Sequence, residues 1–356
     1  MGIKHALVTG AAGFVGGACA RELLARGWRV TALVHRRMPQ GLEGAELVRG
    51  SVTDSERLAP ALAGAGPFDA VVHAAGRAAD VGPRREFRRV NFLGVVNVIE
   101  CMRRVGIERL VHISTTDVYG LRDFHNAGEN TPFADNLRNP YPKYKILAER
   151  AVRDMLPPAR YAILRPGIVW GPGDRTILPR VLAFLRASPF LLHFGRWRGH
   201  SRFPLAHVEN VARAAFLAAG CDDCAGQAYN VVDPEHTTID EYYRMVLDAC
   251  LPDTPARKSL TLPFVLGWAV GQLSTAVSNA LGRDRPLFDP TLYGLYTVSC
   301  NLDFSSDKLQ RLFARHGEEF VDRRSAWTHL RTHLRCVADS CGGPDDVWAS
   351  CDRPCL

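Results

Sequence analysis

Up to about residue 235, the chain alternates short apolar runs with longer stretches of helical period. Runs that are apolar throughout are typical of strands covered by helices on both faces. Strands that alternate with helices form parallel sheets through right-handed crossovers. The sequence therefore predicts an α/β fold with a doubly wound parallel sheet. The predicted strands occupy residues 6–8, 30–34, 47–48, 70–73, 110–114, 161–164 and 228–232.

Three helices are predicted among these strands from the spacing of apolar residues. One begins near Gly13, one runs from about Arg85 to Met102, and one begins near Tyr141. Apolar residues three or four apart place one face of each helix against the sheet.

The alternation weakens beyond residues 171–173, which indicates a second lobe. We expect residues 1–171, completed by about 205–235, to form the sheet domain. Residues 172–204 and 236–335 form a smaller, mainly helical substrate lobe, and residues 336–356 a flexible tail. A chain of 356 residues is long enough for two lobes that share one core.

Composition excludes several classes of protein. The 44 basic residues exceed the 37 acidic ones but are dispersed along the chain, which argues against nucleic acid as a partner. The first residues run directly into an apolar strand and leave no room for a signal peptide, so we expect a cytoplasmic protein. The ten cysteines are scattered, as expected of buried thiols rather than disulfides, and no metal site is predicted.

The segment 262–282 is nearly uncharged and almost long enough to span a bilayer. Its second half contains Gln272, Ser274, Thr275, Ser278 and Asn279, which make it too polar for a membrane span. The sequence favours a buried helix or the wall of an apolar pocket over a segment that makes peripheral contact with a membrane.

A glycine motif directly follows the first predicted strand and opens the first helix, the setting in which such a motif indicates dinucleotide binding. Gly10 permits the tight turn, Gly13 lets a pyrophosphate approach the backbone, and Gly16 lets helix and strand pack closely. The helix N-terminus offers free amides to the phosphates. The predicted contacts here are Gly10, Ala12, Gly13, Phe14, Val15 and Gly16.

The residues after the second strand bear on cofactor preference. An NAD site usually offers a carboxylate there to the adenosine ribose, but this chain has His35, Arg36 and Arg37. Two guanidinium groups suit a 2′-phosphate, so the sequence favours NADP(H) over NAD(H).

Tyr141 and Lys145 are four residues apart on a predicted helix and therefore share one face. An adjacent ammonium stabilises a phenolate, so we expect Lys145 to lower the pKa of Tyr141. Tyr141 would then exchange a proton with a substrate oxygen while nicotinamide exchanges hydride with its carbon, and Lys145 would hold the nicotinamide ribose. Thr115, at the end of the strand 110–114, is placed to bind the same oxygen.

With these motifs on one chain, residues 3–330 resemble the extended short-chain dehydrogenases/reductases, also called the NAD-dependent epimerase/dehydratase family. The resemblance also rests on the motifs at 73–76, 165–173 and 207–212. It implies a Rossmann-type fold, a catalytic role for Thr115, Tyr141 and Lys145, and a structural relay role for Asn91. Further cofactor contacts implied are Ala74, Ala75, Gly76, Pro166, Gly167 and Ile168. A homodimer through the helices that carry Asn91 and Tyr141 is a further implication.

The chain departs from the family pattern at two positions. Gly50-Ser51 stands where the family commonly has Gly-Asp, so the adenine contact falls to Ser51 or Val52. Thr116 replaces the Asp that protonates the leaving hydroxyl in sugar dehydratases, although Asp117 follows it. Water elimination is therefore disfavoured.

The C-terminal half resembles the 3β-hydroxysteroid dehydrogenase/isomerase-like branch, which implies a 3-hydroxy or 3-keto group on a hydrophobic, sterol-like or lipid-like substrate. One alternative is a nucleotide-sugar epimerase that binds a diphosphate. A third hypothesis is a catalytically silent NADP-binding protein, against which the intact Thr115, Tyr141 and Lys145 argue. Apolar pocket walls are expected from Phe190, Leu191, Leu192, Phe194, Phe264, Val265, Leu266 and Trp268. The epimerase alternative would use Arg180, Arg196, Arg198 or Arg202.

Overall fold

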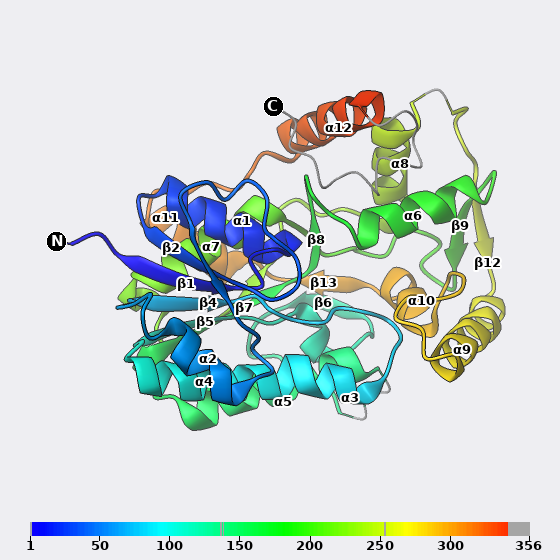
Figure 1. Cartoon of the computed structure of the whole chain (residues 1–356). Helices are drawn as coiled ribbons and strands as arrows, with labels where there is room; N and C mark the ends of the chain where they lie inside the picture. The colour runs from blue at the N-terminus through cyan, green and yellow to red at the C-terminus, as the bar shows by residue number, and fades with distance from the viewer. Residues whose placement is uncertain (1, 136, 138, 253, 341–356) are drawn as a thin grey trace.

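A seven-stranded parallel sheet forms the centre of the protein (Figure 1). The computed structural model describes residues 2–135, 137, 139–252 and 254–340. The strands lie in the order β11-β7-β5-β4-β1-β2-β3, which confirms the predicted doubly wound fold. The order reverses between β1 and β4, where an open parallel sheet binds its ligand. The strands are β1 (His5–Thr9), β2 (Arg29–Val34), β3 (Glu46–Arg49), β4 (Ala70–His73), β5 (Arg109–Ile113), β7 (Tyr161–Pro166) and β11 (Ala228–Val231).

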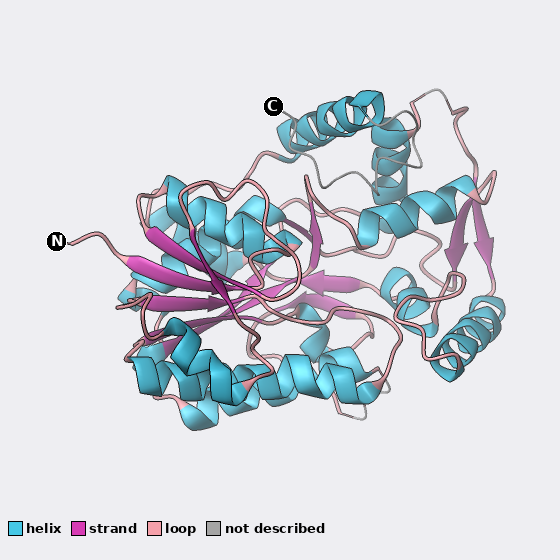
Figure 2. Ribbon diagram, in the orientation of Figure 1, coloured by secondary structure: helices cyan, strands magenta, loops and turns pink. Residues whose placement is uncertain are grey.

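Helices cover both faces of this sheet, which explains why its strands are apolar throughout (Figure 2). One face packs against α1 (Phe14–Ala25), α7 (Val208–Gly220) and α11 (Asp307–Arg315). The other packs against α2 (Ser55–Leu62), α4 (Gly94–Val105) and α5 (Pro140–Met155). The short helix α3 (Arg84–Phe87) and a π-helical turn, Arg88–Leu93, lead into α4.

A second lobe lies at the carboxyl ends of the strands (Figure 1). Its helices are α6 (Ile177–Arg186), α8 (Ile239–Cys250), α9 (Phe264–Ala280), α10 (Leu292–Ser299) and α12 (Arg323–Ser340). The sequence did not predict the three small parallel pairs at this end of the molecule. They join β6 (Phe124–Ala127) to β13 (Leu302–Phe304), β8 (Ile168–Trp170) to β10 (Leu205–His207), and β9 (Leu191–Phe194) to β12 (Ser259–Leu262). The described residues also include four short 3₁₀ or π segments, at Arg88–Leu93, Thr116–Tyr119, Pro158–Arg160 and Asp222–Cys224.

The C-terminal tail and the segment 262–282 can be compared with their predictions only as far as the structure describes them. Helix α12 continues to Ser340, so residues 336–340 are helical although we expected them in a tail. The rest of that tail, including Cys341, Cys351 and Cys355, lies outside the described residues. The segment 262–282 forms α9, and among the described residues no helix is both long and apolar enough to cross a membrane.

Two histidines lie side by side in the core beneath the sheet's carboxyl edge. His73 and His112 occupy paired positions of β4 and β5, and their rings stack 5.8 Å apart. His73 is hydrogen-bonded to Thr9 over 2.8 Å. Neither ring nitrogen of His112 has a hydrogen-bond partner among the described residues. Burial, reinforced by the charge of Lys145, holds the pKa of His112 well below its usual value of 6.5.

We predict that His112→Leu stabilises the protein by about 1 kcal/mol at neutral pH, because it removes a buried polar group without partners. Below the usual histidine pKa, the unfolded chain takes up a proton that folded His112 refuses, so acid destabilises the wild type. The substitution should therefore reduce the loss of unfolding free energy on acidification by up to about 1.4 kcal/mol per pH unit. Urea denaturation at a series of pH values measures both effects, and an unchanged acid slope would contradict the prediction.

Candidate active site

The turn between β1 and α1 is packed too closely for any residue but glycine. Gly10 adopts a φ of +72°, and a Cβ there would lie 2.7 Å from the Ala75 amide nitrogen. A Cβ on Gly16 would lie 2.2 Å from the Gly10 carbonyl oxygen. Gly13 is the N-cap of α1 and gives it no side-chain hydrogen bond, so the N-terminus of the helix stays open. A turn without side chains beside an open helix N-terminus fits a dinucleotide pyrophosphate.

The predicted adenosine contacts lie at the ends of β2 and β3. His35, Arg36 and Arg37 follow β2 and are exposed. The Ser51 hydroxyl is bonded to the Thr53 hydroxyl over 2.9 Å. The Val52 carbonyl accepts a hydrogen bond from Asn97 over 2.8 Å. None of these three residues after β2 carries a carboxylate.

Asn91 fixes the loop that follows β4. Its side chain is buried, accepts from the Arg77 amide over 2.7 Å and donates to the Arg77 carbonyl over 2.9 Å. A Cβ on the neighbouring Gly76 would lie 3.4 Å from Asn91 Oδ1 and 3.5 Å from Lys145 Nζ. Asn91, Gly76 and Lys145 therefore meet at one point, as expected of a loop that receives a cofactor.

Thr115 and Lys145 face the same end of β5. Lys145 is buried on α5 and donates to the Ile113 carbonyl over 2.7 Å. Burial lowers the pKa of Lys145 to about 8, and the charge of Glu149 partly offsets this shift. Thr115 begins the 3₁₀ turn after β5, where its hydroxyl accepts from the Asp117 amide over 3.2 Å.

The Tyr141 phenol differs from the sequence-based expectation. Burial raises its pKa above the usual value of 10, the Asp117 carboxylate raises it further, and a hydrogen bond with Thr115 partly offsets both. Lys145 was expected to lower this pKa, but its ammonium is directed to the Ile113 carbonyl instead. The protein's own groups therefore keep Tyr141 protonated at neutral pH.

Beneath these residues lies a buried ion pair that the sequence analysis did not identify. Arg165 on β7 donates to both oxygens of Glu149 on α5, over 2.9 and 2.7 Å, and both side chains are buried. Ser114 donates to the same carboxylate over 2.6 Å. Although burial alone would raise it, Arg165 and Ser114 hold the pKa of Glu149 below its usual value. The only sequence signal is that Glu149 lies one helical turn after Lys145.

Arg165 extends this network to β11, the edge strand of the central sheet. It donates to the Tyr119 hydroxyl over 2.7 Å, and Tyr119 donates to Asn230 over 2.7 Å. The network thus joins the end of β5 to α5, β7 and β11.

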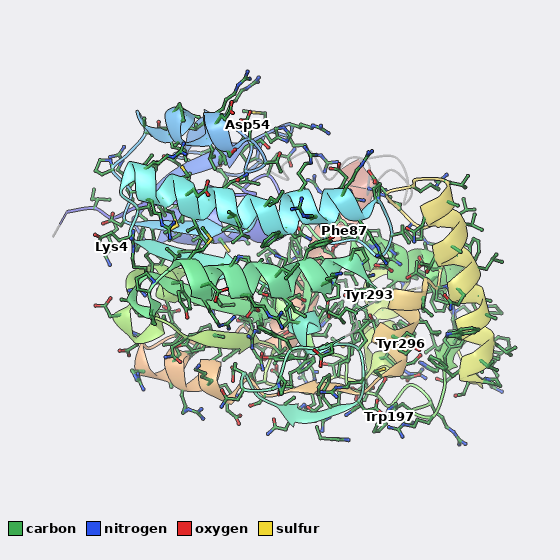
Figure 3. The ribbon with its side chains drawn as sticks, turned by 90° about the horizontal axis from the view of Figure 1, so that it is seen from below. Lys4, Asp54, Phe87, Trp197, Tyr293 and Tyr296 are labelled. Atoms are coloured by element: carbon green, nitrogen blue, oxygen red, sulfur yellow. The ribbon has the colours of Figure 1, made fainter. Side chains whose placement is uncertain are left out.

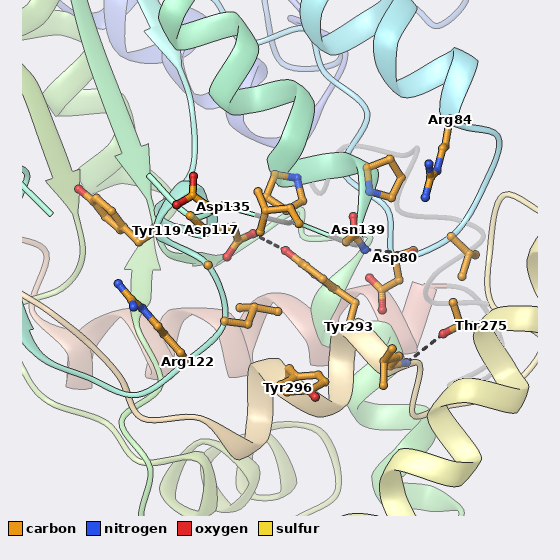
Figure 4. A pocket seen from close by; sticks show the side chains of 18 of the residues that line it. Asp80, Arg84, Asp117, Tyr119, Arg122, Asp135, Asn139, Thr275, Tyr293 and Tyr296 are labelled. Atoms are coloured by element: carbon orange, nitrogen blue, oxygen red, sulfur yellow. Dashed lines mark hydrogen bonds between the residues drawn. The ribbon is translucent and has the colours of Figure 1, made fainter. Parts of the chain in front are cut away.

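A cavity of about 1220 Å³ opens beside the predicted catalytic residues (Figure 4). Asp117, Asn139, Pro140 and Pro142, the sequence neighbours of Thr115 and Tyr141, line one side. The other side comes from α9 and α10, and Tyr293 of α10 donates a hydrogen bond to Asp117 across the cavity wall. Seen from below, Tyr293 and Tyr296 lie between α5 and α9 (Figure 3). The lining from these two helices is Trp268, Thr275, Asn279, Leu292, Tyr293 and Tyr296.

A smaller cavity of about 120 Å³ shares Asp80 and Tyr293 with the first. Ile168, a predicted nicotinamide contact, lines it together with Phe184 and Phe203. Ile168 follows Pro166, which ends β7, and Gly167, where a Cβ would lie 2.1 Å from the Pro204 carbonyl oxygen.

The predicted apolar wall is only partly right. Of its eight residues, Trp268 lines the large cavity and Phe194 the small one. Phe190, Val265 and Leu266 are exposed and line neither cavity. The reason is that α9 directs a different face toward the cavity than the sequence pattern indicated.

The arginines proposed for a diphosphate are mostly engaged elsewhere. Arg180 donates to both oxygens of Asp80, over 3.0 and 2.9 Å, and also to Asp289. Arg196 pairs with Asp123, and Arg198 is exposed. Of the four, only Arg180 lines either cavity.

Comparisons with known proteins agree with this geometry. Residues 6–231 match the NAD dependent epimerase/dehydratase family. The chain is 32% identical to the 2-alkyl-3-oxoalkanoate reductase of Shewanella oneidensis over 86% of this chain and 81% of that protein. It is 27% identical to the mouse sterol-4-alpha-carboxylate 3-dehydrogenase, decarboxylating, over 92% of each chain. The fold resembles the UDP-glucose 4-epimerase of Thermus thermophilus in complex with NAD, with a TM-score of 0.67 and 24% identity over 93% of this chain and 99% of that one.

We predict that Arg165→Met lowers the unfolding free energy by about 3–5 kcal/mol, because it leaves the Glu149 carboxylate buried without its main partner. Arg153→Met is the matched control, since Arg153 also donates to Glu149 but keeps 34% of its side chain exposed. The control should cost about 1 kcal/mol or less. Urea denaturation compares the two variants, and equal losses would contradict a special role for Arg165.

Proposed function

This chain belongs to the NAD-dependent epimerase/dehydratase family of extended short-chain dehydrogenases/reductases, and from that premise we propose that it is a ketoreductase for a hydrophobic substrate. The reacting group is a 3-oxo group, reduced to a 3-hydroxy group, on a lipid-like or sterol-like molecule. One observation carries the proposal: Tyr141, whose raised pKa keeps it protonated, interacts with Thr115 beside a large cavity whose far wall includes Trp268, Leu292 and Tyr296.

Cofactor binding falls to the glycine turn and the residues around it. When bound, the nicotinamide cofactor supplies or accepts the hydride. The open N-terminus of α1 and the bare turn at Gly10, Gly13 and Gly16 hold its pyrophosphate. Lys145 and the Asn91-fixed loop at Gly76 hold its nicotinamide half.

Proton transfer falls to Tyr141 and Thr115. A phenol whose pKa is raised by burial and by Asp117 is protonated at neutral pH, so it donates rather than accepts. Tyr141 would give its phenolic proton to the substrate oxygen as that oxygen gains negative charge, which leaves a phenolate to be reprotonated before the next turnover. The Thr115 hydroxyl would donate a hydrogen bond to the same oxygen.

The polarity of the cavities supports a hydrophobic substrate over a nucleotide sugar. A diphosphate needs free cations, whereas Arg180 is neutralised by Asp80 and Asp289. Trp268, Leu292 and Tyr296 give the large cavity an apolar wall. Two relatives are named for a 3-oxoalkanoate and for oxidation at position 3 of a sterol. A nucleotide-sugar epimerase is the second candidate, because Arg84 and Arg122 also line the large cavity.

We expect Tyr141→Phe to reduce turnover by about 10²- to 10⁴-fold, because the substrate oxygen loses its proton donor. Affinity for NADPH should change by less than about twofold, since the phenol is not needed to hold the pyrophosphate. The assay follows NADPH absorbance with a panel of 3-oxo lipids, 3-oxosteroids and UDP-sugars. Tyr144→Phe, three residues along the same helix, is the control and should retain activity.

Each result of this assay distinguishes one function from the others. Net oxidation of NADPH by a 3-oxo compound supports the reductase. Interconversion of UDP-sugars without a net change in cofactor would identify an epimerase instead. Full activity in Tyr141→Phe would contradict the proposed proton donor, and no turnover with any member of the panel would favour a silent dinucleotide-binding protein.

We further propose that NADP(H) is preferred over NAD(H), because Arg36 and Arg37 are exposed at the end of β2. The double variant Arg36→Ala/Arg37→Ala should bind NADPH about tenfold or more weakly and leave the affinity for NADH nearly unchanged. Titration calorimetry with both cofactors measures this difference. Arg57→Ala, an exposed arginine on α2, controls for general loss of positive charge, and equal losses for both cofactors would contradict the preference.

A further inference from the structure

Exposed apolar side chains are concentrated at one place on the surface. In the part of the chain that the structure describes, thirteen large apolar side chains are exposed, and nine of them fall within residues 260–288. Helix α9 carries five of the nine and lies at the edge of the molecule in both views (Figures 1 and 3). A patch of this kind marks an interaction surface.

Helix α9 has an inner face made only of small residues. Gly267, Gly271, Ser274 and Ser278 are buried and recur at three- or four-residue spacing. A Cβ on Gly267 would lie 2.6 Å from Phe194 and 2.7 Å from Leu295, so the helix packs closely on α10 and β9. The two serines bond the backbone of the following loop, at Phe288 and Leu287.

A second face of α9 forms part of the large cavity. Trp268, Thr275 and Asn279 line that cavity. Thr275 accepts from the Leu292 amide over 3.0 Å, and Asn279 accepts from the Gly82 amide over 3.0 Å. Four polar residues of α9, Ser274, Thr275, Ser278 and Asn279, thus bond the protein, and Gln272 lies partly exposed beside the cavity face.

The third face of α9 points away from the protein and contains no polar side chain. Leu266 and Leu273 are 53% and 58% exposed, and Val265 is 63% exposed. At about 100° per residue, these side chains share one half of the helix surface with three alanines and two further valines. The complete outward face is Val265, Leu266, Ala269, Val270, Leu273, Ala276, Val277 and Ala280.

Cationic side chains follow this outward face at the C-terminal end of α9. Arg283 and Arg285 come directly after the helix, and both are exposed. The intervening Asp284 is paired with Arg77 over 2.8 Å. An apolar face that ends in cations matches the interface of a membrane that contains anionic lipids.

We propose that α9 lies flat on an anionic lipid surface, with its outward face in the headgroup boundary and with Arg283 and Arg285 on lipid phosphates. The helix does not cross the bilayer, because its opposite face is fixed to α10. Since another face of α9 lines the large cavity, this orientation brings the cavity wall to the membrane and gives apolar molecules a short route from the lipid.

The test is flotation of the full chain with vesicles, without substrate or cofactor. Vesicles of phosphatidylcholine containing about one quarter phosphatidylglycerol provide the anionic surface, and pure phosphatidylcholine provides the neutral one. Leu266→Asp/Leu273→Asp should reduce binding to anionic vesicles at least about tenfold. Ile3→Asp/Met38→Asp adds the same charge at exposed apolar positions far from α9 and should bind as the wild type does. Arg283→Gln/Arg285→Gln should abolish the preference for anionic vesicles.

Several outcomes would overturn the proposal. The wild type could fail to float with either vesicle, or the α9 variant could bind as well as the Ile3/Met38 control. A concentration-dependent dimer that Leu266→Asp/Leu273→Asp dissociates would assign the face to a second copy instead. Thermal unfolding of both double variants checks that lost binding does not reflect lost structure. Because no turnover is measured, failure of the ketoreductase assignment leaves this test intact.

Discussion

The buried ion pair between Glu149 and Arg165 is the interaction on which the site depends. A carboxylate and a guanidinium removed from water are tolerated only when hydrogen bonds satisfy both groups. Here Ser114 donates a further hydrogen bond to the Glu149 carboxylate. The Arg165 guanidinium donates further hydrogen bonds to the Tyr119 hydroxyl and the Glu129 carbonyl. Because Ser114 precedes Thr115 and Glu149 follows Lys145 by one helical turn, this pair fixes both neighbours relative to β7. The positions of Thr115 and Lys145 thus follow from the buried network beside them.

Most of the sheet could be predicted because its signals are local. Each of the seven predicted strands is a strand of the central sheet, since an apolar run of four to six residues between glycine turns has few other stable forms. The glycine motif could also be predicted, because Gly10 and Gly16, which contact each other closely, are near neighbours in the sequence. The short pairs such as β6 with β13 were missed, because residues 124 and 302 meet only after the whole fold is built. For the same reason the sequence did not reveal that Tyr293 would reach Asp117. The cytoplasmic location and the homodimer stay predictions.

Helix α9 illustrates how a sequence average can hide a clear pattern. Its polar residues Gln272, Ser274, Thr275, Ser278 and Asn279 argued against a membrane span. In the structure all of them but Gln272 bond the protein's own backbone, and the outward face consists of alanine, valine and leucine. The polarity belongs to the inner and cavity faces, and the outward face is more apolar than the average of the segment. The face of α9 that packs against the protein is determined by α10 and by the loop around residue 288. Neither of these could be placed from the sequence alone.

The sequence predicted that Lys145 acts both on the Tyr141 phenol and on the cofactor, but in the structure Lys145 does not act on the phenol. We expected Lys145 to act on the Tyr141 phenol, but Lys145 contacts the Ile113 carbonyl and approaches Gly76, while Asp117 acts on the phenol. A carboxylate near a phenol opposes ionisation, whereas a nearby ammonium would promote it. The protein by itself therefore prepares an acid rather than a base at Tyr141, and the ammonium is left to act on whatever occupies the glycine turn. Because a protonated phenol can give a proton to a substrate oxygen, this separation of roles supports the proton-donor role proposed for Tyr141.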